Sequence, residues 1–337
     1  MDLKHIKPKT LVFVTTHKCS AQCKNCCFSC SPQKTQRLTI GEMVNYINQV
    51  KNDFLDSVKL LVLTGGESFL LGNELNMVIE YAHSQGFRTR IVTNGFWANS
   101  EEIAIKRLSQ LKKNGLDEIN FSTGDEHLQW IPLENIYNGI KASMDQGIVT
   151  AVNIETHDSS SFNSTTFINQ GALFKYFDKT KYHTPLHVVS GLWVPFARHE
   201  QITYEKRRNL HPIFGCDSIL STLAISPYSQ LMSCCGLPSE YLTIFRLGNL
   251  KEHTIKELYE SQYRDLFKLW LYTEGPHNIM EYIYEKKGIT EPIIGHNCQI
   301  CANILKNKEN IDCLRQNYDD IRNRVLFKYS LLNNDNN

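Results

Sequence analysis

Short apolar runs alternate with longer amphipathic stretches over the first two-thirds of the chain. The apolar runs are rich in β-branched and aromatic residues, which predicts strands. The stretches between them repeat their apolar residues at helical spacing, and several are bounded by capping residues or by glycine. Six strands are therefore expected, at Thr10–Thr15, Lys59–Thr64, Arg88–Thr93, Asp117–Ser122, Val149–Glu155 and Pro185–Ser190. The expected helices are one that begins after the capping box Thr39-x-x-Glu42, Glu74–Gln85, Glu101–Asn114, Leu133–Gln146 and a weaker pattern near Gly171–Phe177.

Strands that alternate with helices predict a parallel sheet, because each crossover is right-handed and is covered by its helix. Chemistry in such sheets gathers at the carboxyl ends of the strands. We expect one site at that edge, because polar or unusual residues follow the expected strands: Cys19–Cys26, Gly65-Gly66-Glu67, Asn94-Gly95, Thr123–His127, Glu155 and Trp193–Arg198.

The alternation ends near Glu200, and cysteines then become frequent again. This change predicts two domains, an α/β domain over residues 1–200 and a smaller α+β module over residues 201–337. The remaining expected elements are a loop over His157–Thr166, a hairpin over Ile225–Ser233, a helix after the capping box Thr254-x-x-Glu257 and a long helix over Cys301–Tyr329.

Composition narrows the function classes. The chain has 337 residues, is 42% hydrophobic and carries a net charge of +1, so there is no electrostatic argument for nucleic acid or an anionic membrane as partner. No apolar run approaches the ~20 residues of a membrane span, and the N-terminus lacks the apolar region of a signal peptide. Eleven cysteines without a secretory signal favour metal binding over disulfides and a reducing cytoplasmic location.

Three cysteines, Cys19, Cys23 and Cys26, are separated by three and by two residues. Thiolate sulfur suits zinc or iron–sulfur clusters. Three ligands this close can hold three irons of a [4Fe–4S] cluster and leave the fourth iron open to a small molecule. A zinc knuckle or a group of buried thiols is the alternative interpretation.

This spacing resembles the signature of the radical S-adenosylmethionine (SAM) enzymes. In that family the open iron chelates the amino and carboxylate groups of SAM, and the reduced cluster cleaves SAM to a 5′-deoxyadenosyl radical. The resemblance implies a partial (β/α)6 TIM-like barrel, a [4Fe–4S] cluster held by these three cysteines, and SAM as cofactor.

Further residues carry the same resemblance. Thr64-Gly65-Gly66-Glu67 resembles the GGE motif of the family, which implies that Gly65, Gly66 and the Glu67 carboxylate contact the methionine part of SAM. Ser122 and Asp125 stand where the family often contacts the ribose hydroxyls, with a solvated loop as the alternative. Asn94, Glu155 and Arg198 are candidates for the polar groups of SAM or of the substrate, with an ordinary turn or ion pair as the alternative, and His127 is expected at the surface.

The cysteine motif departs from the family at one position. The family usually has an aromatic residue just before the third cysteine, near the adenine, whereas this chain has Asn25. Phe28 either takes that place or the contact is missing. Cys27 and Cys30 are additional thiols, either non-ligating or able in principle to replace Cys26.

The C-terminal cysteines form a second motif. Cys216 and Cys234, with 17 residues between them, flank the expected hairpin, and Cys298-x2-Cys301 follows. This arrangement resembles the twitch or SPASM extension of radical SAM enzymes, which carries auxiliary clusters; Ser229 stands where a glycine is usual. The resemblance implies one auxiliary [4Fe–4S] cluster on these four cysteines, with Cys313 as the alternative fourth ligand. A structural four-thiolate zinc site is the other interpretation.

Cys235 is not part of that set of four ligands, although it directly follows the expected ligand Cys234. A thiol S–H bond is weak enough to give a hydrogen atom to a planar carbon radical from the face opposite the one that lost Hα, and some radical SAM peptide epimerases use such a cysteine. Asp217 is a candidate to tune or reprotonate this thiol. The alternative is that Cys235 is a small buried side chain, or the ligand in place of Cys234.

The sequence thus predicts a cytoplasmic radical SAM enzyme that epimerises residues of a ribosomally synthesised peptide or small protein, supplied with electrons by a flavodoxin or ferredoxin. The alternatives are thioether or carbon–carbon crosslinking, formylglycine formation, and a zinc-binding protein without chemistry. Only 18 residues precede Cys19, so we expect leader recognition by another part of the chain or by a partner.

Overall fold

The computed structural model describes residues 6–156, 160–192, 215–236, 239, 241–293 and 295–334. Over these residues the chain forms two compact units. The barrel unit comprises Thr10–Thr203 and Ile225–Ser229, and the helical unit comprises Met1–Lys9, Tyr204–Ala224 and Gln230–Asn337. Each unit is described by itself below.

The sheet of the barrel unit confirms the predicted alternation of strands and helices. Its strands run in the order β6-β5-β4-β3-β2-β1, and every neighbouring pair is parallel. A strand order that follows the sequence, with helical crossovers, is that of a partial (β/α) barrel. The strands are β1 (Thr10–Thr16), β2 (Leu60–Gly65), β3 (Arg88–Thr93), β4 (Glu118–Gly124), β5 (Val149–Thr156) and β6 (His187–Leu192).

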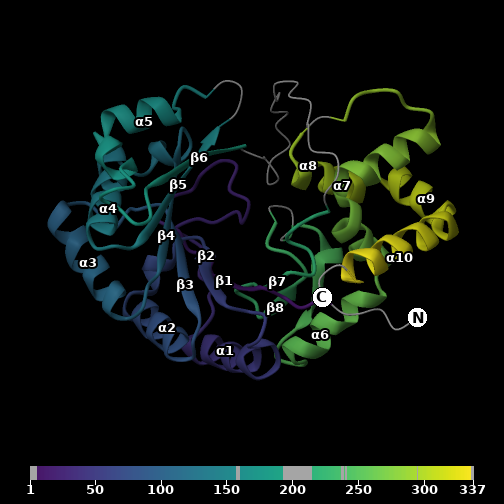
Figure 1. The fold of residues 1–337 in the computed structure, drawn as a ribbon, viewed down its shortest axis with the longest axis horizontal. Coiled ribbons are helices and arrows are strands. Elements are labelled where there is room, and N and C mark those ends of the chain that lie inside the picture. Colours follow the sequence, from purple (N-terminus) through teal and green to yellow (C-terminus); the bar gives the residue numbers. More distant parts are fainter. Residues whose placement is uncertain are drawn as a thin grey trace. The chain divides into compact units, whose positions relative to one another are not determined.

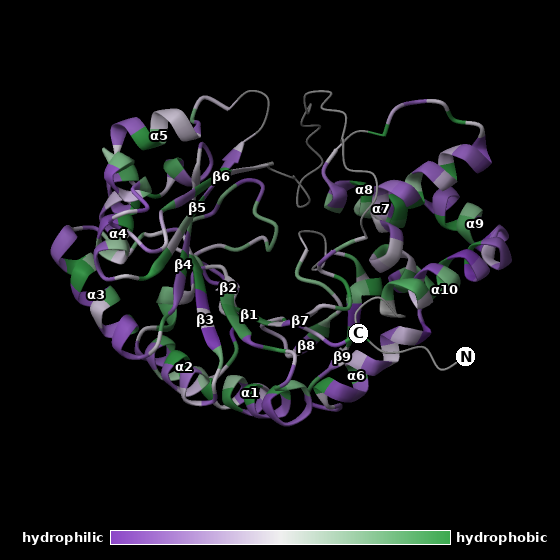
Figure 2. Ribbon diagram, in the orientation of Figure 1, coloured by the Kyte–Doolittle hydropathy of each residue, from purple (hydrophilic) through white to green (hydrophobic). Residues whose placement is uncertain are grey.

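Four amphipathic helices follow the first four strands and line one face of the sheet (Figure 1). Each mixes hydrophobic and hydrophilic residues along its length (Figure 2), because one side is buried against the strands and the other meets solvent. The predicted capping box at Thr39 is formed, and Ser100 caps the third helix. These helices are α1 (Ile40–Phe54), α2 (Asn73–Ser84), α3 (Glu101–Lys113) and α4 (Leu133–Asp145).

The two faces of the sheet differ in polarity. Ile91, Ile119 and Phe121 are fully buried, as expected for the face that the helices cover. The residues that alternate with them are mostly polar and only partly buried, and Arg90 and Glu118 form an ion pair at 2.8 Å. The face of β3 and β4 that these helices leave uncovered is therefore a polar surface that leads up to the carboxyl ends of the strands.

The region after β5 differs from the sequence prediction. Part of the expected loop is a helix, α5 (Ser164–Gln170), and the predicted helix over Gly171–Phe177 is a 3-10 turn over Leu173–Phe177. The helix begins at Ser164, inside the expected loop, because the Asn163 side chain accepts a hydrogen bond from the backbone N–H of Thr166. A run of Ser, Thr and Asn favours loops and helix N-caps alike, so composition alone does not separate the two.

The helical unit contains short strands and a group of helices. Strands β7 (Thr222–Ile225), β8 (Gln230–Met232) and β9 (Arg246–Asn249) are neighbours in that order, and β8 and β9 are antiparallel. The helices are α6 (Ile255–Ser261), which has the predicted capping box, α7 (Leu266–Lys287), α8 (Asn297–Lys306), α9 (Lys308–Gln316) and α10 (Tyr318–Asn334). No helix in the described part of the chain is both long and apolar enough to span a bilayer.

The expected single helix over Cys301–Tyr329 is wrong, because the chain breaks near Asn307 and Asn317. Asn307 has φ −91° and ψ 113°, and its side chain accepts from the backbone N–H groups of Glu309 and Asn310. An Asn side chain competes for backbone hydrogen bonds in this way, so it ends one helix and caps the next.

The turn between β7 and β8 belongs to the barrel unit. Ser229 has φ +59°, a left-handed conformation that favours glycine, which is the residue usual at this position in the resembled module. Its hydroxyl donates to Glu42 Oε1 at 3.1 Å, and the Tyr228 ring contacts His17 edge-on. The polar contact and the ring contact offset the conformational cost of a serine at this position.

Helix α7 bends at Gly275-Pro276, and a buried carboxylate stands beside the bend. The Glu274 side chain is 1% exposed and receives Arg324 Nε at 2.9 Å, Arg324 Nη2 at 2.6 Å and Lys328 Nζ at 2.9 Å. Burial raises the pKa of Glu274, but the hydrogen bonds from Arg324 and Lys328 outweigh burial, so that the pKa lies below its usual range. These contacts hold α10 against α7.

Arg324→Met is expected to destabilise the protein by about 2 kcal/mol near pH 7, because it leaves the buried Glu274 with half-exposed Lys328 as its remaining partner. The folded pKa of Glu274 is depressed, so the ion pair stabilises fully above the unfolded pKa of about 4.3 and its contribution is lost as pH falls through the folded pKa. Denaturant titrations at neutral and acidic pH measure both effects. Arg322→Met is the matched control, because Arg322 lies 3.9 Å from the exposed Asp319; an equal loss in the two variants would contradict the role of Glu274.

Candidate active site

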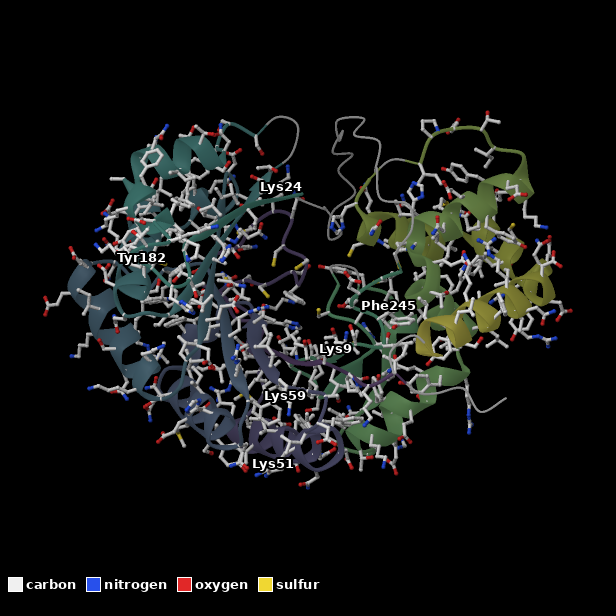
Figure 3. All side chains as sticks on the ribbon, in the orientation of Figure 1. Lys9, Lys24, Lys51, Lys59, Tyr182 and Phe245 are labelled. Carbon is white, nitrogen blue, oxygen red and sulfur yellow. The ribbon has the colours of Figure 1, made fainter. Side chains whose placement is uncertain are left out.

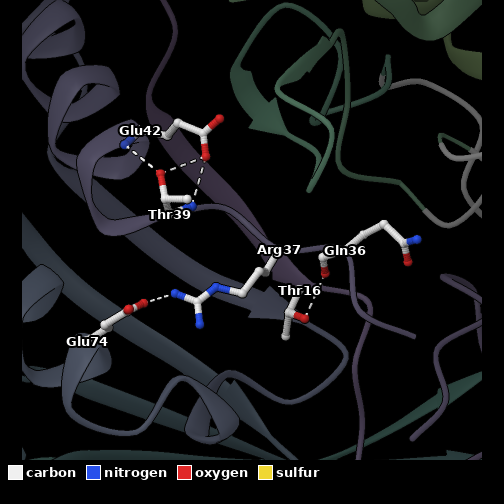
Figure 4. A network of polar contacts seen from close by, with 6 residues as sticks. All are labelled: Thr16, Gln36, Arg37, Thr39, Glu42 and Glu74. Carbon is white, nitrogen blue, oxygen red and sulfur yellow. Dashed lines mark hydrogen bonds and ion pairs between the residues drawn. The ribbon is translucent and has the colours of Figure 1, made fainter. Parts of the chain in front are cut away.

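The cysteine motif lies in a loop whose two ends are held together at the end of β1. Thr16 Oγ1 donates to the backbone carbonyl of Gln36 at 2.9 Å, and the backbone N–H of His17 donates to the same carbonyl at 2.9 Å. Figure 4 shows the Thr16–Gln36 contact together with the neighbouring Arg37–Glu74 ion pair and the Thr39–Glu42 capping box. Residues 17–38 therefore form a closed loop, which we call the cysteine loop.

The Gly-Gly turn after β2 fixes the start of this loop. The backbone N–H of Gly66 donates to Thr16 O at 2.7 Å, and that of Glu67 donates to Lys18 O at 3.0 Å. A Cβ on Gly66 would lie 2.1 Å from Lys18 O, and Gly65 has φ +123°. The structure thus places the two glycines against the backbone that leads into Cys19, while their predicted contact with SAM remains a prediction.

The three predicted ligands of the first cluster lie together in the cysteine loop. Cys23 and Cys26 pack against a small buried group that includes Cys19 and Cys30, and Phe28 packs there too. Lys24 of the loop is labelled in Figure 3, which draws the side chains as sticks. The three predicted ligand thiols therefore lie in one small group of the cysteine loop, and their binding of a cluster stays a prediction.

Hydrogen-bond donors point at two of these sulfurs. The backbone N–H of Ala21 lies 3.4 Å from Cys19 Sγ, and that of Cys30 lies 3.4 Å from Cys26 Sγ. Burial raises the pKa of Cys19 to about 11, whereas a hydrogen bond from the Cys30 thiol lowers the pKa of Cys26 to about 6. Donors of this kind stabilise thiolates, so the loop fits an iron–sulfur cluster bound by Cys19, Cys23 and Cys26.

Asn25, the residue that departs from the family pattern, is 5% exposed. Among the described residues its side-chain oxygen has no hydrogen-bond partner, although it is buried. An unsatisfied buried acceptor carries a cost in free energy unless a bound molecule completes it. The position is therefore consistent with a ligand beside the cysteine loop.

Glu67 lies deeper than the sequence suggested. Its side chain is fully buried, and its two oxygens accept from Thr93 Oγ1, from the backbone N–H of Asn94 at 2.9 Å and from that of Phe69 at 3.1 Å. Burial raises the pKa of Glu67 to about 7. The carboxylate joins the ends of β2 and β3, and a contact with the SAM ammonium, as predicted, requires that one of these bonds be shared or replaced.

Two carboxylates in the segment that follows β4 contact two other loops. Asp125 accepts from the backbone N–H and the hydroxyl of Ser161, both at 2.9 Å, and so anchors the loop after β5. Glu126 Oε2 accepts from the backbone N–H of Lys24 at 2.9 Å, inside the cysteine loop. Asp125 thus has a structural role in the described conformation, and its predicted ribose contact remains a prediction.

His127 is not the surface side chain that the sequence suggested. Its Nδ1 lies 2.7 Å from Glu155 Oε1, and the two side chains are 18% and 9% exposed. Burial lowers the pKa of His127, but the hydrogen bond to Glu155 outweighs it and the pKa is raised. Gly124 makes room for this pair, because a Cβ there would lie 2.4 Å from the Glu155 carboxyl carbon.

The remaining predicted SAM contacts have different outcomes. Ser122 is half-buried on β4, on the same side of the strand as Asn120 and Glu118, which is the uncovered polar face. Arg198 lies outside the described residues. Neither placement tests the predicted contacts, which remain predictions.

The helical unit gathers four of its cysteines. Cys301 lies close enough to Cys234, Cys216 and Cys298 for the thiolates to repel one another, and burial together with this repulsion raises the pKa of Cys301. Cys234 is 6% exposed and lies near Cys216, Cys235 and Cys298. These four residues are the predicted auxiliary ligand set. Cys313 lies near Tyr282, and its sulfur is 4.0 Å from the Asn317 amide.

Cys235 is exposed, and it lies close enough to Cys216 and Cys234 to act on both electrostatically. Ser218 Oγ lies 3.4 Å from its sulfur and accepts the backbone N–H of Cys235 at 3.2 Å. Asp217 is also exposed and acts electrostatically on Cys216 and Tyr272. The structure therefore gives the Cys235 thiol a hydroxyl neighbour, Ser218, and leaves the proton-transfer role of Asp217 as a prediction.

The arrangement of ligands bears on the zinc alternative. The ligands of one zinc ion converge on a single point, whereas each thiolate of a [4Fe–4S] cluster binds a different iron, so cluster ligands surround a larger volume. In the described part of the chain, no three His, Cys, Asp or Glu side chains are grouped tightly enough for one metal ion. All eleven cysteines are described and are free thiols. Iron and zinc analysis of the purified protein decides between the two interpretations.

Sequence reasoning missed three residues of these sites. Glu126, which holds the cysteine loop, was named only within the segment Thr123–His127 and was given no role; Ser218, beside Cys235, was not named, and His127 was assigned to the surface. One signal was available: Glu126 and His127 directly follow β4, at the edge where chemistry gathers. Ser218 offered no signal beyond its closeness to Cys216.

Comparison with known proteins extends this picture. Residues 13–154 match the model of the Radical SAM superfamily, which is less than half of the chain. YydG of Bacillus subtilis (strain 168), a protein named for peptide biosynthesis, is 25% identical over 137 residues. That match covers 40% of this chain and 42% of YydG, so it spans less than half of the length of the relative.

Solved structures share the fold. The structure of native anSMEcpe with bound AdoMet and Cp18Cys peptide is similar with a TM-score of 0.55 at 13% identity, covering 94% of this chain and 99% of that chain. A tagged form of anSMEcpe with bound AdoMet is similar with a TM-score of 0.56 at 13% identity and the same coverage. At this identity the likeness is one of fold, and it agrees with the predicted α/β partial barrel.

Proposed function

We propose that the chain, whose residues 13–154 match the Radical SAM superfamily, is a radical SAM enzyme that converts L residues of a ribosomally synthesised peptide to D residues. A domain of this superfamily works with a [4Fe–4S] cluster and SAM. We assign the cluster to Cys19, Cys23 and Cys26, and an auxiliary cluster to Cys216, Cys234, Cys298 and Cys301. The division near residue 200 into a catalytic domain and an auxiliary-cluster module is part of this proposal.

The peptide substrate is supported by the relatives. YydG is named for peptide biosynthesis, and anSMEcpe was solved with a peptide bound. The polar uncovered face of the barrel sheet, with Arg90, Glu118 and Ser122, offers hydrogen-bond partners to an extended backbone. We further propose a reducing cytoplasmic location, because thiols that bind iron–sulfur clusters must stay reduced.

The observation that carries epimerisation is the exposed thiol of Cys235 next to the buried Cys234. The four gathered cysteines of this unit are all buried or partly buried, whereas Cys235 is exposed, with Ser218 beside it. A residue that donates a hydrogen atom must reach the substrate carbon, whereas a cysteine that binds the cluster need not. Exposure therefore separates Cys235 from the ligand set.

The residues of the chain then act as follows. When bound, the cluster and SAM supply the agent that removes Hα from the substrate. The Cys235 thiol gives its hydrogen atom to the planar carbon from the other face, so a new C–H bond forms as the S–H bond breaks. One electron and one proton restore the thiol; the electron comes from a one-electron donor of the flavodoxin or ferredoxin class, and Asp217 or solvent gives the proton.

Crosslinking and formylglycine formation are the alternative outcomes, and they differ in mass. Epimerisation in D2O replaces one hydrogen by deuterium at each inverted centre, provided that the thiol has exchanged with solvent. In H2O the mass of the peptide is unchanged. Crosslinking removes two hydrogens. Incubation of the anaerobically reconstituted protein with the small peptide encoded beside its gene, followed by mass and chiral amino-acid analysis, tests the proposal. A product lighter by two hydrogens without D residues would overturn it.

A further inference from the structure

The side chain of Asn94 connects the Gly-Gly-Glu turn to the cysteine loop. Asn94 follows β3 and is 5% exposed. Its Nδ2 lies 3.5 Å from Cys19 Sγ and 3.1 Å from Ser20 Oγ. Its backbone N–H donates to Glu67 Oε2 at 2.9 Å. One residue thus contacts a predicted cluster ligand with its side chain and the buried carboxylate with its backbone.

The orientation of the Asn94 amide is determined by its surroundings. The side-chain oxygen accepts from the backbone N–H of Phe96 at 3.1 Å, which an NH2 group cannot do. The two N–H bonds of the amide must therefore point the other way, toward the sulfur of Cys19 and the hydroxyl of Ser20. A reversed amide would lose the Phe96 hydrogen bond and direct its oxygen at the sulfur.

The position of Asn94 is fixed from the other side as well. Glu67 holds its backbone N–H, and Thr93 Oγ1, which donates to Glu67, accepts from the backbone N–H of Gly95 at 3.1 Å and from Trp97 Nε1 at 3.0 Å. The Trp97 ring is stacked on Phe69 with centroids 4.2 Å apart. The donor is thus held in place by buried contacts that do not include the cysteine loop.

We propose that Asn94 is a positioning residue for the cluster: its amide donates an N–H···S hydrogen bond to Cys19 and raises the reduction potential of the cluster. Hydrogen bonds to the sulfurs stabilise the more negative, reduced state and are one of the means by which a protein sets this potential. The backbone donor of Ala21 is supplied by the loop itself, whereas that of Asn94 comes from the barrel sheet.

This inference concerns the radical SAM domain and holds whatever the substrate. It also differs from the predicted contact of Asn94 with SAM. A SAM contact predicts weaker SAM binding on substitution with an unchanged potential in the absence of SAM. A contact with Cys19 predicts a changed potential before SAM is added.

The test is a redox titration of the reconstituted protein without SAM, followed by electron paramagnetic resonance. The signal of the first cluster is identified by the change that SAM causes in a parallel sample, because its open iron distinguishes it from the auxiliary cluster. Asn94→Ser and Asn94→Asp are the variants. We expect the midpoint potential to shift to more negative values in both, and further in Asn94→Asp, because a carboxylate would face the sulfur.

Asn76→Ser is the matched control. It makes the same change in α2, where the Asn76 side chain contacts Asn73 and Arg107 and no residue of the cysteine loop, so the potential should stay at the wild-type value. Thermal unfolding of the iron-free variants checks that the fold is kept. A wild-type potential in Asn94→Ser would overturn the inference even if iron content fell. Failure to find a D residue in any peptide would bear on the proposed function and leave this result unaffected.

Discussion

Gly66→Ala is expected to leave the protein without its first iron–sulfur cluster. The new methyl carbon would lie 2.1 Å from the carbonyl oxygen of Lys18 and 2.7 Å from its carbonyl carbon, both of them backbone atoms that no side-chain rotation can move. Cys19 is the next residue. To relieve the contact, the chain must move the first ligand away from Cys23 and Cys26.

Iron analysis of the reconstituted variant should therefore fall to about half, which corresponds to the auxiliary cluster alone, and the spectral change on adding SAM should disappear. The free energy of unfolding should fall by about 3 kcal/mol or more, since backbone hydrogen bonds of the turn are lost as well. Gly41→Ala is the matched control: Gly41 lies in α1 with no atom within 4 Å of the added methyl, so it should keep all of its iron. A full complement of iron in Gly66→Ala would show that the close approach is not required.

Cys235→Ala should stop inversion while SAM cleavage continues. The substitution removes the S–H bond that supplies the second hydrogen atom and leaves the cysteine loop of the barrel unit intact. We expect D-residue formation to fall at least about a hundredfold, and the rate of 5′-deoxyadenosine formation to stay within about threefold, as for loss of a group that acts after the first hydrogen transfer. Deuterium from D2O should disappear from the product in parallel.

Two controls separate this role from that of a ligand. Cys313→Ala removes a thiol near Tyr282 and should leave inversion unchanged. Iron content should be unchanged in Cys235→Ala; a loss of iron would instead make Cys235 a cluster ligand. Ser218→Ala removes the hydroxyl 3.4 Å from the sulfur and should slow inversion only modestly, because the S–H bond itself remains.

The sequence predicted strands and helices correctly wherever a single hydrophobic periodicity or a capping box was present. Strands β1 to β6 follow continuous or alternating apolar runs, and the boxes at Thr39 and Thr254 mark helix starts at the expected residues. Where Asn serves as both a helix breaker and a helix cap, as at Asn163 and Asn307, composition does not decide which role the residue takes.

The sequence predicted which thiols lie near one another better than it predicted the contacts that support them. The cysteines of each predicted set are neighbours in the structure, and their role as ligands stays a prediction. The role of Glu67 depends on how deeply its side chain is buried, and a carboxylate after Gly-Gly can be exposed or buried. Its hydrogen bonds from Thr93 and Asn94 follow from the fold and not from the local sequence. The contact of Glu126 with Lys24 joins residues 102 positions apart, which no local pattern reveals.

The closed cysteine loop has a consequence for the order of maturation. Zinc fingers acquire their shape only when metal arrives, because little else holds them. Here the end of β1, the Gly66 turn, Glu126 and Asn94 hold the loop by contacts that include no metal. We therefore expect the cysteine loop to keep its position in the iron-free protein and to receive iron and sulfide after the chain has folded.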